Sequence, residues 1–377
     1  MLAEVLAPDE PLPADPTREA NLAGHLVVPG FIDAHTHLLL EGIVSYEREL
    51  LKDALPLRTL RAAAHARMAL DHGFLVMRDV CTEGASYADV ALRDAITSGL
   101  CEGPRIIPSG PGIGVTGGYV PEGYAPGICM PSGCALVDSP EAARREVRTQ
   151  VSHRVEWIKV FADWNYPPPG TPESRVLPTF TRPELEAIVD EARRRGRKVA
   201  AHATSDAGAR QAIACGAASL EHMGDLSRET LDAAAEAGVF LVPTLSIEAA
   251  FLELRPEKRD RMRARFEVVT QSFARALESG VRIACGTDIG CYPHAQGSLS
   301  ELRLMMDLGM SPLNALRAAT SEAATLLDLP NRGRIAPGTV ADLCAFTLSP
   351  DGDLRATLTR ERPKIVIQAG RIIRGTL

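Results

Sequence analysis

Short apolar runs recur along the chain and alternate with longer amphipathic stretches. Runs with so few polar residues are typical of parallel strands that are buried on both faces of a sheet. Eight runs have this character: VVPGFIDAH, GFLVMRDV, PRIIPSG, VEWIKVFA, GRKVAAHA, AASLEHM, GVFLVPTL and GVRIACGTD. The pattern therefore predicts eight strands with apolar side chains on both faces.

Helix signals fill the intervals between these runs. Residues 181–196 open with TRPE, a capping box with proline in the first turn, and residues 311–327 open with Ser-Pro. Six more helices are predicted, over 58–72, 87–98, 140–153, 206–215, 227–238 and 256–279. Strands that are each followed by a helix predict an α/β fold, the (β/α)8 TIM barrel, whose active sites lie where the strands end.

The pattern changes near the end of the chain. The segments GRIAPGTVADLCAF and KIVIQAGRII combine strands and turns without helices. We expect residues 1–28 and 333–377 to form a small β-sandwich domain from the two chain ends, and residues 29–332 to form the barrel. Because the first residues have a loop-like composition, this sandwich is expected to be reduced, either naturally or by truncation.

Composition narrows the class of protein. The chain has 377 residues, of which 45% are hydrophobic, and its 41 basic and 48 acidic residues give a net charge of −7. This mild, dispersed charge predicts neither nucleic-acid nor membrane-surface binding. The chain has no apolar run of about 18 residues, no signal-peptide pattern and no CxxC among its scattered cysteines. We expect a cytoplasmic protein with a small-molecule partner, and leave homo-oligomer formation open.

Histidines at a predicted strand end suggest a metal site. His35 and His37 end the first strand, and alternation along a strand turns both imidazoles to the same side. An HxH pair alone is a weak signal, but other strands also end in ligand-type residues. These residues are His202, His222 and Asp288. Their common position at one end of the barrel predicts a metal centre in its interior.

Lys159 lies in the strand WIKVF, in phase with Trp157 and Phe161. If this side faces the barrel interior, the lysine needs a reason to be there, because a buried ammonium group is costly without partners. The alternative is a lysine at a strand end that reaches solvent. A buried lysine has a lowered pKa and supplies free amine, which reacts with carbon dioxide to give a carbamate that can bridge two metals.

These segments resemble the amidohydrolase superfamily. The resemblance runs from about Val27 to about Thr347 and rests on VVPGFIDAHTH, IKVF, AHA, EHM, GTD and GRIAPGTVADLCAF. The most similar branch contains Xaa-Pro and Xaa-Arg dipeptidases, ochratoxinase-like amidases and imidazolonepropionase-like proteins that use a carboxylated lysine. It implies two divalent metal ions: the more buried one at His35, His37 and Asp288, the second at His202 and His222, and N6-carboxylated Lys159 between them.

Two long segments, 110–137 and 163–179, follow predicted strands and should cover the catalytic face. In VTGGYVPEGY, Tyr119 stands where the comparable dipeptidases usually have a histidine after TGG. This departure questions the dipeptidase assignment without affecting the metal site. Tyr119 is expected either to donate a hydrogen bond to the substrate or to pack within its loop.

Three other residues are candidates near the site. Arg78 ends the second strand and is expected to form a rim ion pair with Asp79, with binding of a substrate carboxylate as the alternative. His294 follows Asp288 in a loop over the site, so contact with substrate is one interpretation and ordinary packing is the other. Glu221 should point away from the metals, because it alternates with His222, and is interpreted as outer support or packing.

The chemistry expected of such a site is hydrolysis. A hydroxide that bridges two metals would attack a carbonyl carbon, one metal would polarise the carbonyl oxygen, and Asp288 would pass the proton to the leaving amine. We expect a metal-dependent amidohydrolase that cleaves a dipeptide or an N-acyl amino acid. The same site could instead cleave a lactone, a cyclic amide or a phosphotriester.

The filled ligand positions argue against a non-catalytic scaffold. Nitrogen and carboxylate ligands suit zinc, and they leave manganese, iron and cobalt open.

Overall fold

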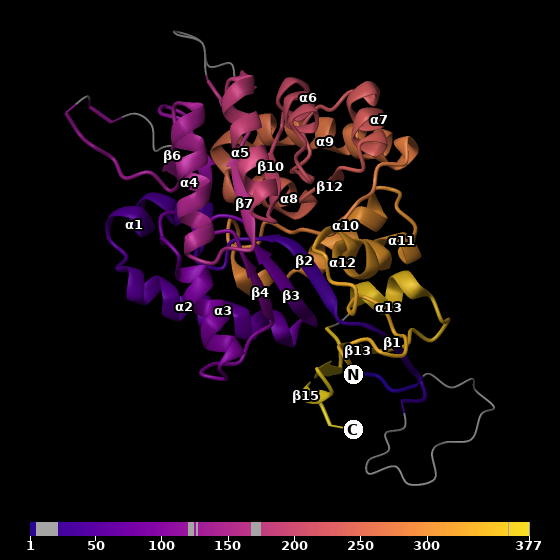
Figure 1. The fold of residues 1–377 in the computed structure, drawn as a ribbon. Coiled ribbons are helices and arrows are strands. Elements are labelled where there is room, and N and C mark those ends of the chain that lie inside the picture. The colour runs from indigo at the N-terminus through magenta and orange to yellow at the C-terminus, as the bar shows by residue number, and fades with distance from the viewer. Residues whose placement is uncertain (5–21, 120–123, 126, 167–174, 361, 377) are drawn as a thin grey trace.

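The structure is a computed structural model that describes residues 1–4, 22–119, 124–125, 127–166, 175–360 and 362–376. Strands lie near the centre of the molecule with helices around them, and the two chain ends lie close together at one side (Figure 1). Within this described part of the chain, none of the helices has both the length and the apolar character needed to cross a membrane. The alternation of strands and helices is that of a TIM-barrel-like α/β fold.

Two parallel sheets carry the strands that the apolar runs predict. The first has the order β12-β11-β10-β7-β5-β6. Its strands are β5 (Ile113–Gly114), β6 (Ala135–Leu136), β7 (Trp157–Phe161), β10 (Lys198–His202), β11 (Ser219–Glu221) and β12 (Phe240–Val242). The second sheet consists of β2 (Phe31–Thr36), β3 (Phe74–Asp79) and β4 (Arg105–Pro108).

Backbone hydrogen bonds connect the two sheets at both sides. Glu156 N–H donates to Pro108 O at 2.8 Å, which links β4 to the start of β7. On the other side, Ala34 N–H donates to Cys285 O at 2.8 Å, so that segment 282–289 lies beside β2. Parallel bridges connect the same segment to β12 and β2. The parallel strands therefore follow one another around a common centre.

Segment 282–289 takes the place of the predicted eighth strand, but it forms only isolated bridges. A Cβ atom added at Gly286 would lie 2.3 Å from Val242 Cγ1 and 2.7 Å from His35 Cβ, so the backbone approaches its neighbours very closely. Asp288 then has a φ of 60°, in the left-handed region. This turn ends the extended conformation and directs the Asp288 side chain toward the strand ends.

The predicted helices are present, with ends that differ by a few residues at most positions. The helices are α1 (Tyr46–Leu51), α2 (Leu55–Asp71), α3 (Ala88–Thr97), α4 (Pro140–Ser152), α5 (Arg182–Arg194), α6 (Asp206–Cys215), α7 (Arg228–Glu236), α8 (Leu245–Leu254), α9 (Arg259–Ser279), α10 (Leu299–Asp307), α11 (Pro312–Arg317), α12 (Ala323–Leu326) and α13 (Leu354–Arg360). A π-helical turn, η4 (Ala318–Glu322), separates α11 from α12 where one helix was predicted. Short 3-10 turns are η1 (Ile43–Ser45), η2 (Pro256–Lys258) and η3 (His294–Gln296).

Helix α8 was not predicted. Its first turn is stabilised by a residue that is distant in the sequence. The backbone N–H groups of Leu245 and Ser246 donate to the two carboxylate oxygens of Glu301, at 2.9 and 2.7 Å. The acceptor for these first-turn donors is thus on α10, far along the chain. Local sequence signals therefore could not reveal where this helix begins.

The two chain ends meet in an antiparallel sheet with the order β1-β13-β14-β15. These strands are β1 (His25–Pro29), β13 (Leu343–Thr347), β14 (Ile365–Gln368) and β15 (Arg371–Arg374). The described residues form one such layer and not two facing layers. Residues 5–21 of the predicted small domain lie outside the described residues, and its boundaries stay a prediction. A short hairpin of β8 (Asp163–Asn165) and β9 (Val176–Pro178) occupies part of segment 163–179.

Apolar side chains fill the centre at the N-terminal ends of the strands. Ile32, Val76 and Trp157 belong to one buried cluster, which Leu326 and Leu329 also join. Lys159 follows Trp157 on the same face of β7. The centre is therefore apolar at one end, and its polar side chains gather at the C-terminal ends of the strands.

Candidate metal centre

The structure brings all six predicted metal ligands together at the C-terminal ends of the strands. Five of them line one cavity of about 240 Å³: His37, Lys159, His202, His222 and Asp288. His35 lies behind them and is fully buried. Residues 120–123, 126 and 167–174 of the two predicted covering segments lie outside the described residues.

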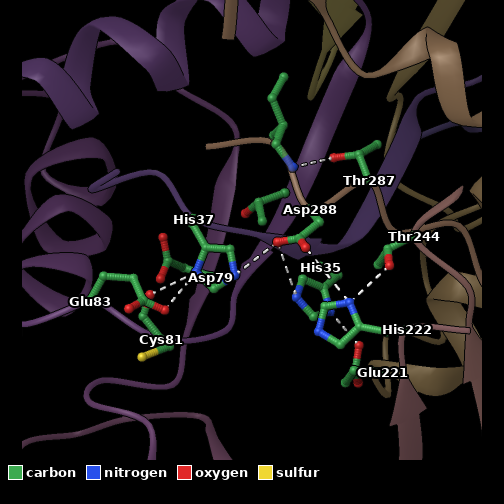
Figure 2. Close-up of polar contacts among 12 residues, drawn as sticks. His35, His37, Asp79, Cys81, Glu83, Glu221, His222, Thr244, Thr287 and Asp288 are labelled. Atoms are coloured by element: carbon green, nitrogen blue, oxygen red, sulfur yellow. Dashed lines mark hydrogen bonds and ion pairs between the residues drawn. The ribbon is translucent and has the colours of Figure 1, made fainter. Parts of the chain in front are cut away.

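Asp288 lies among the imidazoles, as Figure 2 shows. Its Oδ1 is 3.1 Å from His37 Nε2 and 3.6 Å from His35 Nε2. Its Oδ2 is 3.6 Å from His222 Nδ1. The rings of His202 and His222 are 4.5 Å apart, centre to centre. One carboxylate thus contacts three predicted ligands from two other segments of the chain.

Buried polar atoms at this centre lack a hydrogen-bond partner among the described residues. His35 Nε2 and Lys159 Nζ are among them. Lys159 is only 1% exposed, and burial lowers the pKa of its amine, against the opposing charges of Glu221 and Asp288. Buried polar atoms normally find partners, and imidazole and carboxylate ligands are those that zinc-like cations prefer. The residues present therefore fit a metal centre with a carboxylated lysine.

Supporting hydrogen bonds fix the orientation of the imidazoles. His35 Nδ1 lies 2.7 Å from Glu221 Oε2, and His222 Nδ1 lies 2.9 Å from Thr244 Oγ1. His37 Nδ1 lies 3.0 Å from the carbonyl oxygen of Cys81. When Nδ1–H donates in this way, Nε2 carries the lone pair that a metal requires.

Glu221, which contacts His35, is itself held by an ion pair with Arg78. Its Oε1 accepts a hydrogen bond from the Arg78 guanidinium at 2.6 Å, and both side chains are fully buried. His222 follows with a φ of 74°, which interrupts the alternation of the strand and turns the imidazole into the cavity. Glu221 is therefore a support for His35, one of the two roles that the sequence left open.

Asp33 and Thr287 position the Asp288 segment. Thr287 donates to Asp33 from both its backbone N–H, at 3.1 Å, and its hydroxyl, at 2.7 Å. Burial raises the pKa of Asp33 to about 7, although these hydrogen bonds oppose the rise. The bonds attach the turn that carries Asp288 to strand β2.

Burial determines most of the ionisation at the centre. It lowers the pKa of His35 to about 4, with help from the charge of Lys159, and lowers the pKa values of His202 and His222 well below normal. Burial also opposes protonation of His37, but contact with Asp288 outweighs it and raises that pKa to about 9. The neutral imidazoles are in the form that binds metal.

Two candidate substrate residues, Arg78 and His294, lie outside the described cavity lining. Arg78 is fully buried, lies over the Trp157 ring at 4.4 Å and bonds to Glu221 instead of Asp79, so it does not reach the cavity. His294 stacks on His65 at 3.7 Å between ring centres and bonds to the carbonyl oxygen of Leu40 at 3.1 Å. Both side chains therefore pack inside the protein, and their contact with a substrate stays a prediction.

Tyr119 lies in the cavity wall and is 9% exposed. Its hydroxyl donates to Glu83 Oε2 at 2.8 Å, and its ring stacks on Phe161 at 4.2 Å. The other oxygen of Glu83 lies 3.7 Å from His37 Nδ1. The ring of Tyr119 therefore packs in the cavity wall and its hydroxyl is bonded to Glu83, while a hydrogen bond from Tyr119 to the substrate stays a prediction.

Sequence reasoning missed several residues of the cavity wall. They are Glu83, Trp164, Glu248, Phe251, Arg261, Arg265 and Cys291. Most come from α8, which was not predicted, or from α9, whose position depends on tertiary packing. The signal available in the sequence was Glu248, a single charge in the apolar stretch LSIEAAF.

Comparison with known proteins agrees with this geometry. A model of the amidohydrolase family matches residues 26–373. Ochratoxinase from Aspergillus niger is 28% identical over 381 residues, which cover 93% of this chain and 76% of that protein.

Two solved structures are similar along most of their length. A Xaa-Pro dipeptidase with bound methionine in the active site has a TM-score of 0.81 and 29% identity, with 93% of this chain and 87% of that chain covered. A prolidase complexed with N-methylphosphonate-L-proline has a TM-score of 0.86 and 27% identity, with 98% and 91% covered. The chain therefore belongs to the amidohydrolase family and is a hydrolase that acts on amide carbon–nitrogen bonds.

Proposed function

We propose that this protein is a binuclear metal-dependent hydrolase that cleaves the amide bond of a dipeptide or an N-acyl amino acid. The observation that carries the proposal is the buried, unpartnered amine of Lys159, which lines the same cavity as Asp288 and three imidazoles. The printed names of the relatives, a Xaa-Pro dipeptidase and a prolidase among them, support a substrate of this class.

Six residues would hold the metal ions. His35, His37 and Asp288 would bind the more buried ion, His202 and His222 the second, and carboxylated Lys159 would join the two. Two zinc ions bound there would lower the pKa of a shared water and polarise a substrate carbonyl. Strands β2, β3, β4, β7, β10, β11 and β12, together with segment 282–289, would form a closed (β/α)8 barrel around this centre.

Asp288 would move the proton. Its carboxylate is buried, and contact with His37 keeps its pKa low even though burial acts to raise it. The low pKa keeps the carboxylate ionised, which is the form that would accept a proton from the attacking water before the proton passes to the leaving amine. Tyr119 lines the same cavity and would orient the substrate, while Glu83 holds its hydroxyl in place.

The cavity suits a small substrate that carries an apolar group. Phe161, Trp164 and Phe251 contribute aromatic rings to its wall. The cysteines of the described residues are all free thiols, which is consistent with action in a reducing cytoplasm.

An activity panel tests the proposal. The zinc-loaded protein would be assayed with dipeptides, N-acyl amino acids, lactones and phosphotriesters, and its metal content would be measured in the same preparation. We expect hydrolysis of the first two classes, and Lys159→Ala should lose the second metal and most of the activity. Turnover confined to lactones or phosphotriesters would overturn the assignment, and a protein that binds no metal would be a scaffold.

A further inference from the structure

Helices α8 and α9 pack against one another and form one wall of the cavity. Helix α8 contributes Ile247, Glu248 and Phe251, and α9 contributes Arg261 and Arg265. Apart from Lys159 and the histidines of the metal centre, these arginines are the cations of the described cavity lining. A substrate in the cavity therefore meets positive charge at this wall.

Arg265 forms a two-bond ion pair with Glu248. Its Nε lies 2.6 Å from Glu248 Oε2, and a terminal nitrogen lies 2.5 Å from Oε1. The Glu248 side chain is 3% exposed and the Arg265 side chain is 40% exposed, so this contact attaches α9 to α8 from the partly open side of the wall. The carboxylate of Glu248 balances the charge of Arg265.

Arg261 lies one helical turn before Arg265 and lines the same cavity. It forms no ion pair with any residue that the structure describes. Arg261 is thus a cation at the cavity whose donors are available to a ligand.

Apolar side chains line the cavity together with this cation. They are Trp164, Val176, Ile247 and Phe251. An amino acid with an apolar side chain matches such a lining, because it offers an apolar surface and a carboxylate within a few bonds of each other. An arginine can bind that carboxylate through two parallel hydrogen bonds.

We propose that Arg261 binds the free carboxylate of the amino acid released by hydrolysis, and that this amino acid has an apolar side chain. The inference rests on the proposed function and narrows it to substrates with a free C-terminal carboxylate. It separates dipeptides and N-acyl amino acids from neutral lactones and phosphotriesters. Arg265 contributes by holding α9, and therefore Arg261, in position.

The kinetic test compares alanyl-leucine with alanyl-leucinamide, which differ only in the carboxylate. For the wild-type zinc enzyme, we expect KM for the acid to be about tenfold lower, equivalent to about 1.4 kcal/mol. Arg261→Met keeps part of the apolar stem and should remove this difference with little change in kcat. Arg263→Met is the matched control, because Arg263 lies on the same helix outside the cavity lining, and it should retain the preference.

A binding test separates this inference from the proposed function. Calorimetry with leucine and leucinamide needs no turnover, and we expect the wild-type enzyme to prefer leucine about tenfold while Arg261→Met shows no preference. If no dipeptide or N-acyl amino acid of the activity panel is hydrolysed but leucine is preferred, the proposed function fails and the carboxylate site stands. Equal binding of both ligands to the wild type, or equal weakening of both by Arg261→Met, overturns the role of Arg261.

Discussion

The ion pair between Arg78 and Glu221 lies beneath the candidate metal centre and is closed to solvent. Both side chains are 0% exposed, and the guanidinium and carboxylate are 2.6 Å apart. Arg78 also donates to the carbonyl oxygen of Ala34 at 2.5 Å and lies over the Trp157 ring. Replacing Arg78 with Met preserves much of the packing on Trp157 but leaves Glu221 as a buried charge without its partner.

The expected cost follows from this burial. Removal of one partner of a buried ion pair typically destabilises a protein by about 3–5 kcal/mol. The double variant Arg78→Met/Glu221→Leu removes both charges and leaves mainly His35 Nδ1 without its acceptor, which costs about 1–3 kcal/mol. The double variant should therefore be more stable than Arg78→Met alone.

Urea unfolding followed by circular dichroism measures this effect. The protein should be metal-free, because bound metal would stabilise the folded state by mass action. Arg182→Met is the control, since Arg182 pairs with Glu186 on the surface, where such bonds contribute about 0–1 kcal/mol. If Arg78→Met costs no more than Arg182→Met, the reasoning about the buried pair is wrong.

Three further predictions concern the site and the surface. Asp288→Asn should lower kcat by about 10²–10⁴-fold while retaining zinc; unchanged turnover in the same assay would exclude the proton-transfer role. Glu221→Gln should weaken zinc binding about 10- to 100-fold in competition with a chelator, because His35 loses its charged acceptor, and unchanged affinity would argue against that support. The hydrogen bond from Arg148 lowers the pKa of Glu191 to about 2. The ionised carboxylate therefore stabilises the folded state above its unfolded pKa of about 4, and this stabilisation is lost as the pH falls toward 2. Arg148→Met should move the acid-unfolding midpoint, followed by circular dichroism, to higher pH, and an unchanged midpoint would contradict this.

Strand periodicity predicted much of the fold and of the metal site. The same-side positions of Trp157, Lys159 and Phe161 follow from alternation along β7, and the structure buries all three. Regular strands determine such directions locally, without information about the rest of the molecule. The sequence signals that predicted the helix ends are equally local. One example is the capping box of α5, in which Glu184 accepts a hydrogen bond from the Thr181 backbone.

Alternation did not predict the direction of the Glu221 side chain. It places Glu221 and His222 on opposite sides of a regular strand, but His222 has a φ of 74° and both side chains turn inward. A left-handed residue of this kind costs about 1–3 kcal/mol and depends on surrounding contacts to maintain it. His222 Nδ1 contacts Thr244, another residue with positive φ, so the conformation depends on tertiary structure that the sequence pattern does not reveal.

The cavity wall formed by α8 and α9 was the least predictable part of the site. The first backbone N–H of helix α8 donates to the carboxylate of Glu301. Glu248 and Arg265 come into contact because α8 and α9 pack together. These contacts join segments that are separated in sequence. The residues of this wall therefore emerged only from the three-dimensional arrangement.

The central claim is a two-metal centre joined by carboxylated Lys159. The most direct test is mass spectrometry of the zinc-loaded native protein, combined with elemental analysis, after preparation in bicarbonate. We expect two zinc ions per chain, with a carbon dioxide adduct on Lys159 that disappears together with one zinc in Lys159→Ala. A single zinc beside an unmodified Lys159, or two zinc ions retained by Lys159→Ala, would contradict the claim.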